Sequence, residues 1–430
     1  YLLFIHAEKI KHPALLYTPQ RIEQAKISVR QDTRMSEAWN SIRKTADNLL
    51  QKTQLNKIDY LALSFLMTDE KKYADKIKEI LLDVTEDETW GNQEMMARTP
   101  AWNADLEIAH KAFYAAIAYD AIYQELSQSE RRKIAHGLKR LAMDPLLGDW
   151  ILEPTRIHSL NSMGHNWWTS CTCMGGLLAL SLQNELEEAR DAVKIINEVL
   201  PEWFEFAGDV LHQKPKTFDE TGGMYECLNY ANYGIQEALL FRLAWMNTHK
   251  EDKAIEIPQL EKLSDFFVHI CYPRTGMLYN INFGDSHKNT AAESSLMLLY
   301  AMGIQNVLLI EKGQNHSGTI RSFYKDGKRV DKDWQGQKIE SSGTITFFDG
   351  TKETTLDFFD SILRKHEIDS KFSEEVEKIV KQDEILDIYT SKDEYKAKTV
   401  ILAIGRMGKP NKPDIEISGI AKKRVHYNLD

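Results

Sequence analysis

The sequence predicts two domains of different fold class, an all-α domain over residues 1–303 and a smaller α/β segment over residues 304–430. Helical apolar spacing continues to about residue 302, and short compact apolar runs typical of strands follow it. A chain of 430 residues is also long enough to bury more than one hydrophobic core. We therefore expect a multidomain protein with its larger domain first.

The helical domain is predicted from helix start signals. Thr18 and Pro19 place an N-cap hydroxyl and an N1 proline before a helix. Residues 127–130 have the sequence of a capping box, with Ser127 and Glu130 as its partners. Three further stretches have helical spacing: residues 173–185, 191–207 and 234–247. Paired helices with short links indicate an all-α array, either a closed α/α barrel or an open solenoid.

The α/β segment is predicted from a change in pattern near Gly303. The apolar run over residues 306–310 ends in Glu311 and is typical of a buried strand. Further elements are expected as follows: a strand over residues 344–348, a helix over 354–366, and a strand pair over 384–390 and 395–404.

Composition excludes some classes of function. The formal net charge of −10 argues against a general nucleic-acid binder, which would carry a basic face. The sequence has no apolar run of the length that a membrane-spanning helix needs, so no membrane span is expected. Cys171 and Cys173 have no second cysteine–histidine pair at zinc-site spacing, so two small buried residues are expected there and no metal. The apolar start over residues 1–7 fits either the tail of a cleaved secretory signal or an arbitrary chain start.

Three stretches of the helical domain carry more chemistry than packing requires. Each places aromatic and hydrogen-bonding side chains at a predicted helix start, where backbone N–H groups favour an anion. The first contains Trp102, Asn103 and Asp105; the second His165, Asn166, Trp167 and Trp168; the third Tyr225, Glu226, Tyr230 and Tyr233. Together they would form a groove suited to sugar rings.

A purely structural role explains each stretch equally well when it is taken alone. Trp167 and Trp168 are more typical of a core position than of a sugar platform. Asn166 fits a helix N-cap, a common role of asparagine. The tyrosines of the third stretch fit ordinary packing along one helix. The functional interpretation therefore depends on the three stretches occurring together.

In this order the three stretches resemble those of the heparinase II/III-like polysaccharide lyases. The matching segments are residues 102–106, 165–168 and 222–233, and the resemblance covers most of residues 10–303. Cys227 departs from the family, which usually has glycine there. The resemblance implies an (α/α)-toroid that cleaves a uronic-acid-containing polysaccharide by β-elimination, with no required cofactor and an acidic polysaccharide or oligosaccharide as partner.

The resemblance also implies roles for these residues. The proton beside a carboxylate is barely acidic, so a donor must neutralise that charge before a base removes the proton. We assign carboxylate neutralisation to Asn166 and proton transfer to Tyr230, which can act as base, acid or both if its pKa is lowered locally. His165 is a second candidate for either catalytic role. Residues expected to bind substrate are Trp102, Asn103, Asp105, Trp167, Trp168, Tyr225, Glu226 and Tyr233.

The last third of the chain resembles a different family. Residues 306–313, 319–333 and 398–410 look like a thioredoxin-reductase-like FAD/NAD(P)-binding oxidoreductase, which implies a partial Rossmann-like fold. In that family the acid that ends the second strand, here Glu311, binds the adenosine ribose of FAD. The glycine-rich turn that cradles the pyrophosphate is missing, because residues 281–286 contain the single glycine Gly284. Glu311 then also fits an exposed strand-end acid without a ligand.

The sequence thus predicts a lyase domain joined near Gly303 to a flavoprotein fragment. Too little β sequence remains for the β-sandwich that usually follows such a lyase domain, so reduced activity is expected. The alternatives are a flavin-dependent NAD(P)H oxidoreductase with bound FAD, and a carbohydrate-binding helical module without turnover. The lyase interpretation implies a periplasmic or secreted protein, and the flavin alternative a cytoplasmic one.

Overall fold

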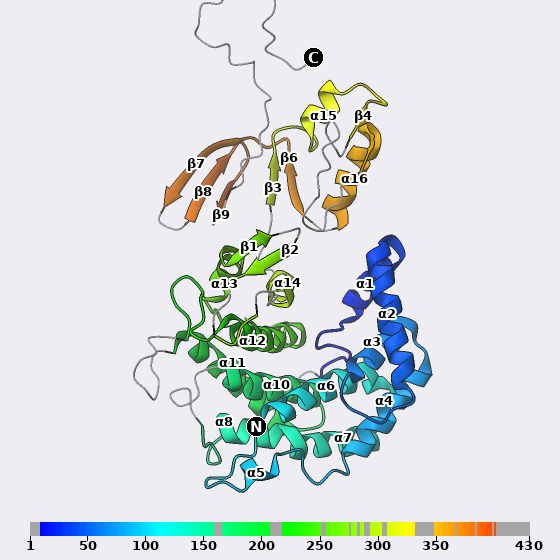
Figure 1. Ribbon diagram of the computed structural model, residues 1–430, viewed down its shortest axis with the longest axis vertical. Coiled ribbons are helices and arrows are strands. Elements are labelled where there is room, and N and C mark those ends of the chain that lie inside the picture. Colours follow the sequence, from blue (N-terminus) through cyan, green and yellow to red (C-terminus); the bar gives the residue numbers. More distant parts are fainter. Residues whose placement is uncertain are drawn as a thin grey trace, which may run out of the picture. The chain divides into compact units, whose positions relative to one another are not determined.

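A computed structural model describes residues 9–158, 166–206, 217–250, 255–274, 277–281, 284–287, 293–302, 308–331, 348–365, 368–382, 385–397 and 400. The chain divides into two units, which we call the helical unit (Tyr1–Gln305) and the C-terminal unit (Asn306–Asp430). The helical unit consists mainly of helices, and the C-terminal unit is a small α/β segment (Figure 1). The boundary predicted at residues 303–304 lies outside the described residues.

The first helices begin where the sequence places their caps. Helix α1 (Pro19–Gln31) follows Thr18, whose hydroxyl accepts from the Arg21 N–H, and its first residue is proline as predicted. Helix α2 (Thr33–Leu49) is capped by Asp32. The capping box of Ser127 and Glu130 is present at the start of α7 (Gln128–Leu138). Because capping satisfies N–H groups that lack a partner within the helix, these starts are specified locally.

The remaining described helices and strands of the helical unit follow in order. They are α3 (Ile58–Thr68), α4 (Lys71–Val84), α5 (Gln93–Met96), α6 (Leu106–Ile122), the 3-10 turn η1 (Tyr123–Glu125), the π-helical turn η2 (Lys139–Met143), α8 (Asp144–Trp150), α10 (Asn166–Leu182), α11 (Glu187–Glu205), α12 (Leu228–Thr248), α13 (Leu260–His269), β1 (Cys271–Arg274), β2 (Met277–Asn280) and α14 (Glu293–Ala301). The helices predicted at residues 173–185, 191–207 and 234–247 correspond to α10, α11 and α12. The predicted closed toroid stays a prediction.

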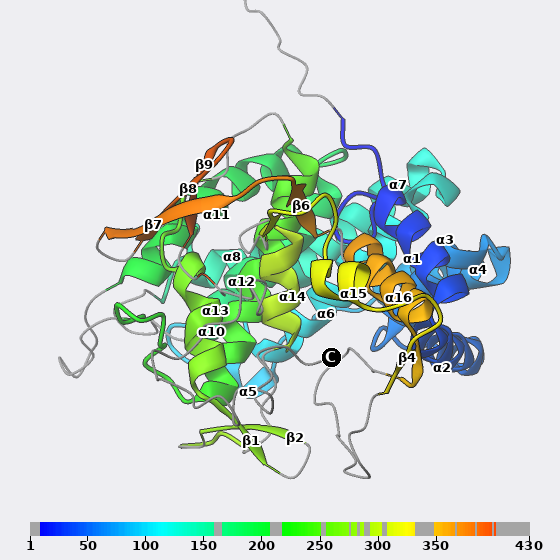
Figure 2. The same ribbon diagram turned by 90° about the horizontal axis from the view of Figure 1, so that it is seen from above.

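Helix α10 is the centre of the helical unit. It packs against α6, α8, α11 and α12, and Figures 1 and 2 show α6 and α12 beside it. From Asn166 to Leu182 every described side chain except Trp167 is buried. Helix α6 approaches closely because its contact residues are small, with Ala112, Ala115 and Ala116 fully buried. The residues at the first turns of α10 are therefore held by neighbours on several sides.

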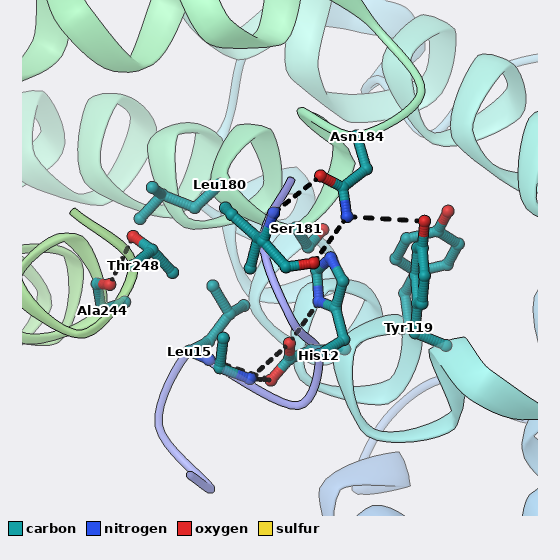
Figure 3. A network of polar contacts seen from close by, with 12 residues as sticks. His12, Leu15, Tyr119, Leu180, Ser181, Asn184, Ala244 and Thr248 are labelled. Atoms are coloured by element: carbon teal, nitrogen blue, oxygen red, sulfur yellow. Dashed lines mark hydrogen bonds and ion pairs between the residues drawn. The ribbon is translucent and has the colours of Figure 1, made fainter. Parts of the chain in front are cut away.

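A buried carboxylate anchors the N-terminal segment to α6. Asp120 accepts hydrogen bonds from His12 Nδ1 at 2.6 Å and from the backbone N–H groups of Ala14 and Leu15. Asn184 binds the same segment through both backbone groups of Ile10. Figure 3 shows His12 and Leu15 with Tyr119 and Asn184 around them. Three donors on one buried carboxylate fix this segment through hydrogen bonds to a charged group, which are the stronger kind.

The described residues of the C-terminal unit form small sheets and two helices. Strand β3 (Leu308–Glu311) pairs in parallel with β6 (Asp369–Phe372). Between them come α15 (Gly318–Phe323), the short strand pair β4 (Arg329–Val330) and β5 (Gly350–Thr351), and α16 (Lys352–Lys365). Strands β7 (Val376–Gln382), β8 (Ile385–Thr390) and β9 (Glu394–Ala397) then form an antiparallel sheet in that order.

These elements confirm most of the predicted α/β pattern. Strand β3, helix α16 and strand β8 occur where the sequence predicts them, with described ends shifted by up to a few residues. Strand β9 pairs with β8 as predicted but ends at Ala397, and residues 398–399 and 401–404 of the predicted strand lie outside the described residues. The predicted strand over residues 344–348 lies outside the described residues except for Phe348. Strand β7 was not predicted, because glutamate and lysine residues interrupt its apolar alternation.

Two further sequence expectations concern membranes and cysteines. No described helix has the length and apolar character needed to cross a membrane. Cys171 and Cys173 are buried free thiols within α10. Within the described ranges, no three histidine, cysteine or acidic side chains are grouped as metal ligands would be.

Candidate functional site

The structure brings Asn166 and Tyr230 to neighbouring helix starts. Asn166 is the first residue of α10, and its backbone N–H donates to Glu226 Oε2 at 3.0 Å. Glu226 precedes α12, and Tyr230 lies in the first turn of that helix. A Cβ atom added to Gly234, one turn after Tyr230, would lie 3.3 Å from Asn166 Cα, so the two helices approach closely here. We call this group (Asn166, Glu226, Tyr230, Tyr233 and the residues they contact) the α10–α12 site.

Asn166 and Tyr230 differ in exposure. Asn166 is 5% exposed and Tyr230 is 39% exposed. A buried amide beside a reachable hydroxyl is compatible with one group that fixes a substrate charge and another that exchanges a proton. The N-termini of α10 and α12 also meet at this site, and their N–H groups favour a negatively charged ligand.

Tyr230 is joined to a turn that follows strand β2. Its hydroxyl donates to Asp285 Oδ2 at 3.2 Å, and the neighbouring Ser286 hydroxyl accepts from the Asn229 N–H. The turn fits closely, because a Cβ added to Gly284 would lie 3.0 Å from Cys227 Cβ. The hydrogen bond to Asp285, followed by its negative charge, raises the pKa of Tyr230. The local lowering of the pKa that a tyrosine base requires is therefore not what the structure provides at Tyr230.

Tyr233 contacts a histidine that the sequence did not single out. Its hydroxyl oxygen lies 2.5 Å from Nε2 of His110 on α6. Desolvation lowers the pKa of His110, and burial together with the charge of Glu237 raises the pKa of Tyr233. The Tyr233 phenol therefore keeps its proton and can donate a hydrogen bond to the neutral imidazole of His110.

Glu237 is a buried carboxyl group one turn further along α12. It is 6% exposed and accepts a hydrogen bond from Ser170 of α10. Burial raises its pKa to about 8, against its hydrogen bonds with Ser170 and Tyr233, which lower it. A carboxyl group with this pKa keeps its proton at neutral pH, which avoids the cost of a buried negative charge.

The first predicted stretch forms a second cluster around a buried aspartate. Asp149 accepts from the backbone N–H groups of Asn103 and Ala104 at 2.6 and 2.8 Å, and from Asn103 Nδ2 at 3.0 Å. Trp102 is partly exposed, with the Arg98 guanidinium 4.6 Å from its ring centre and His158 edge-on at 4.5 Å. Trp102 therefore presents an aromatic ring that its neighbours hold in place.

Several predicted site residues have structural partners that account for them. Asp105 is the N-cap of α6 and accepts from the Ile108 N–H at 2.8 Å. Trp168 is 1% exposed and stacks parallel to Trp203, so it packs in the core. Trp167 is partly buried against the core. Tyr225 is 54% exposed, and His165 lies outside the described residues.

The two clusters lie around the same part of α10. Burial and then the carboxyl groups of Glu237, Asp105 and Asp149 raise the pKa of the Cys171 thiol. Cys171 lies in the second turn of α10, so both clusters are close to it. The structure thus gathers parts of all three predicted stretches near the first turns of one helix.

Sequence reasoning missed His110 and Glu237, and the sequence carries a weak signal for Glu237 alone. His110 follows the predicted helix start by one turn, but its position between Ala109 and Lys111 gave no reason to choose it. Glu237 lies four residues after Tyr233, on the face of α12 that also carries apolar core residues. A charged residue on an apolar helix face is a functional signal that the periodicity could have shown.

In the C-terminal unit, Glu311 is the residue predicted to bind the FAD ribose. Its Oε1 accepts from the Gly313 N–H at 2.6 Å, so one carboxylate oxygen already closes the turn after β3. The turn in the place of the pyrophosphate cradle contains Gly284 alone and is bound to α12 through Ser286. The described residues around Glu311 and Gly284 therefore do not form a complete FAD site of the glycine-rich type.

A pocket of 320 Å³ lies elsewhere in the C-terminal unit. It is lined by Asn315, His316, Asp360, Leu363, Arg364, Ile368, Ser370 and Phe372. His316 Nε2 lies 2.6 Å from Asp360 Oδ1, and Arg321 reaches the same carboxylate. The hydrogen bond with His316 lowers the pKa of Asp360, so the pair holds the loop after β3 against α16.

Comparison with known protein families finds a match in the last third of the chain. The sequence model of a family described as pyridine nucleotide-disulphide oxidoreductase matches residues 297–430. The match begins within α14 and covers less than half of the chain. No curated protein matches the chain. The oxidoreductase resemblance of the last third is thus supported, and the match includes no residue of the α10–α12 site.

Proposed function

We propose that the helical unit is a polysaccharide lyase that cleaves a uronic-acid-containing polysaccharide by β-elimination. The observation that carries this proposal is the close approach of the first turns of α10 and α12, which carry Asn166 and Tyr230, with the Asn166 N–H bound to Glu226. The two residues lie 64 positions apart in the sequence (230 − 166), so only the fold brings their helix starts together.

The proposed chemistry needs three groups at the reacting sugar. The Asn166 amide and the N–H groups at the helix starts would hold the uronate carboxylate and withdraw charge from it. A base would then remove the proton beside that carboxylate, and an acid would protonate the leaving oxygen. The Asp285 carboxylate keeps the proton on Tyr230, which favours the acid role for this tyrosine.

The proposal is tested by an ultraviolet assay on uronate polysaccharides. The purified chain is incubated with heparan sulfate, alginate and chondroitin, and the absorbance of an unsaturated uronate is followed. Asn166→Ala and Tyr230→Phe should each lower the rate by at least about 100-fold, as expected for loss of a charge-stabilising donor or a proton-transfer group. The matched controls Asn40→Ala and Tyr60→Phe lie on α2 and α3 and should leave the rate unchanged.

The same assay separates the lyase from a binding module. A chain that binds one of these polysaccharides without forming the double bond would be a carbohydrate-binding module. Full activity in Asn166→Ala or in Tyr230→Phe would contradict the proposed site. The lyase proposal also includes a periplasmic or secreted location, which cell fractionation of the producing organism tests.

A second candidate function rests on the C-terminal unit. The match of residues 297–430 to an oxidoreductase family favours a flavin-dependent NAD(P)H oxidoreductase, which would be cytoplasmic. The parallel pair β3–β6 and the antiparallel sheet β7–β9 support this candidate, and the missing glycine-rich turn opposes it. A purified chain with the visible spectrum of FAD would support it, and a colourless chain that takes up no added FAD would contradict it.

A further inference from the structure

A row of hydrogen-bonded side chains leads from the core of the helical unit to the α10–α12 site. Ser170 of α10 donates to Glu237, and Glu237 also bonds Tyr233, one turn earlier on α12. Tyr233 in turn meets His110 of α6 at 2.5 Å, with the two rings nearly perpendicular at 82°. The row therefore joins three helices and ends at a histidine that is exposed to solvent.

The protonation states give this row a direction. The protonated carboxyl group of Glu237 can donate, and the desolvated His110 ring is neutral and can accept at Nε2. The Tyr233 hydroxyl between them therefore accepts on its core side and donates to His110. The other titratable groups that face the pair are Glu107 of α6, which favours a protonated His110, and the buried thiol of Cys171 on α10.

We infer that Tyr233 is the base of the proposed elimination and that His110 is the positioning residue that takes up the tyrosine proton. This inference rests on the proposed lyase function. Tyr233 and Tyr230 are three residues apart on α12, so their side chains leave the helix on neighbouring positions. Because burial raises the pKa of Tyr233, this tyrosine does not act as a free phenolate. It can take up the substrate proton only as its own proton passes to the neutral imidazole of His110. Tyr230, which is bonded to a carboxylate, keeps its proton for the leaving oxygen.

The proposed elimination step conserves protons and electrons. As the C–H bond beside the carboxylate breaks, its proton passes to the Tyr233 oxygen, and the Tyr233 proton passes to His110 Nε2. The electron pair of that bond forms the new C=C bond while the C–O bond to the leaving sugar breaks. The leaving oxygen takes the proton of Tyr230. Solvent then removes the proton from His110 and returns one to Tyr230, so no further reactant is needed.

The first test compares His110→Gln with His136→Gln. Glutamine at position 110 keeps a neutral hydrogen-bond acceptor for Tyr233 but cannot take up a proton. We expect kcat to fall by about 100-fold or more with KM changed by less than about 2-fold, the usual size of a general-base contribution. In the wild type, kcat should fall as the pH drops and His110 becomes protonated, and this acid limb should be absent in His110→Gln. His136 is exposed on α7 and is the matched control.

A second measurement needs no activity. The ¹⁵N NMR signal of His110 Nε2 should shift in Tyr233→Phe, because the hydrogen bond from the tyrosine is lost, while the His136 signal stays unchanged. An unshifted His110 signal would overturn the pairing and with it the inference, even in an active enzyme. Full kcat in His110→Gln would overturn the inference and leave the lyase function standing. A shifted signal without turnover on any uronate polysaccharide would instead overturn the lyase function on which the inference rests.

Discussion

Tyr230 and Tyr233 show how neighbouring residues of one type acquire different properties. Both lie on α12, and each hydroxyl has one dominant partner from another segment of the chain. Tyr230 meets the carboxylate of Asp285, and Tyr233 meets the imidazole of His110. A carboxylate disfavours the phenolate by repulsion, whereas a neutral imidazole offers the proton another place. The spacing of the two tyrosines along the helix does not predict which partner each hydroxyl contacts.

Asp285→Asn should narrow the pH range of activity on the alkaline side. Asp285 raises the pKa of Tyr230, so the acid stays protonated to a higher pH. Without the carboxylate the pKa of Tyr230 falls toward its ordinary value, and the alkaline limb of kcat/KM should move to lower pH. The measurement is the pH profile of both proteins. An unchanged alkaline limb would show that Tyr230 is not the group that titrates there.

Glu237→Gln should flatten the pH dependence of stability. Burial raises the pKa of Glu237 in the folded state to about 8, well above the ordinary value of a glutamate. Its contribution is fully present below the unfolded pKa and is lost as the pH rises toward the folded pKa, because the unfolded chain then releases a proton that the folded chain keeps. The wild type should therefore lose on the order of a few kcal/mol of unfolding free energy between about pH 5 and pH 8. Denaturant unfolding at both pH values tests this, and equal losses in the two proteins would contradict it.

At the scale of elements, glycines set how closely α10 and α12 approach. A Cβ on Gly176 would lie 2.8 Å from Phe241 Cε2 and from Ile196 Cδ1, and one on Gly234 would press on Asn166 and Thr169. Overpacking of this kind costs about 1–3 kcal/mol. Both glycines belong to the same helix contact, but only Gly234 lies beside the α10–α12 site.

Gly234→Ala and Gly176→Ala form a matched pair. Both variants should lower the midpoint of thermal unfolding, because each adds a methyl group to a filled contact. Only Gly234→Ala should also lower kcat in the lyase assay, because it displaces Asn166. Equal kcat in the two variants at a temperature where both are folded would show that the position of Asn166 is not critical.

The sequence predicted the elements better than their contacts. Two helix starts were predicted correctly, one from Thr18 and Pro19 and one from the pair of Ser127 and Glu130, because capping depends on residues a few positions apart. Strand β7 was missed, because its two lysines and one glutamate interrupt the apolar alternation that is typical of a half-exposed strand. The parallel pairing of β3 with β6 joins residues about 60 positions apart, and no local pattern specifies it.

The candidate site shows the same limit. Asn166, Glu226 and Tyr230 could be named from motif order, and the structure places them together. Their partners His110 and Asp285 reach them from elsewhere in the chain, so only the packing of α6 and of the turn after β2 identifies them. Asp105 and Trp168 have structural partners that the motif alone did not show.

At the scale of the whole molecule, the two units differ in the size of their described cores. In the described part of the C-terminal unit, the buried hydrophobic residues are Leu356 and Ile388. The helical unit instead has a continuous core that extends from Leu15 to Met302. Burial of apolar surface is the main favourable contribution to folding, and the pair β3–β6 also leaves strand edges open in the described segments.

Limited proteolysis should therefore cleave the C-terminal unit first. We expect a protected fragment that contains α1 to α14 to accumulate, and mass spectrometry of the fragments over time tests this. A protected fragment that contains β3 to β9 instead would contradict the expectation. Thermal unfolding should likewise show an early transition that is absent from the isolated protected fragment.

The anchoring of the first segment to Asp120 and Asn184 has a consequence for biosynthesis. The Ile10 N–H and its partner Asn184 are separated by 174 positions. At about 5–20 residues per second, the ribosome needs roughly 10–35 s to make the chain between them. The segment around Ile10 thus leaves the ribosome long before its partners exist and docks late. Nascent-chain complexes stalled shortly after residue 122 and well beyond residue 184 would show this segment first accessible and then protected.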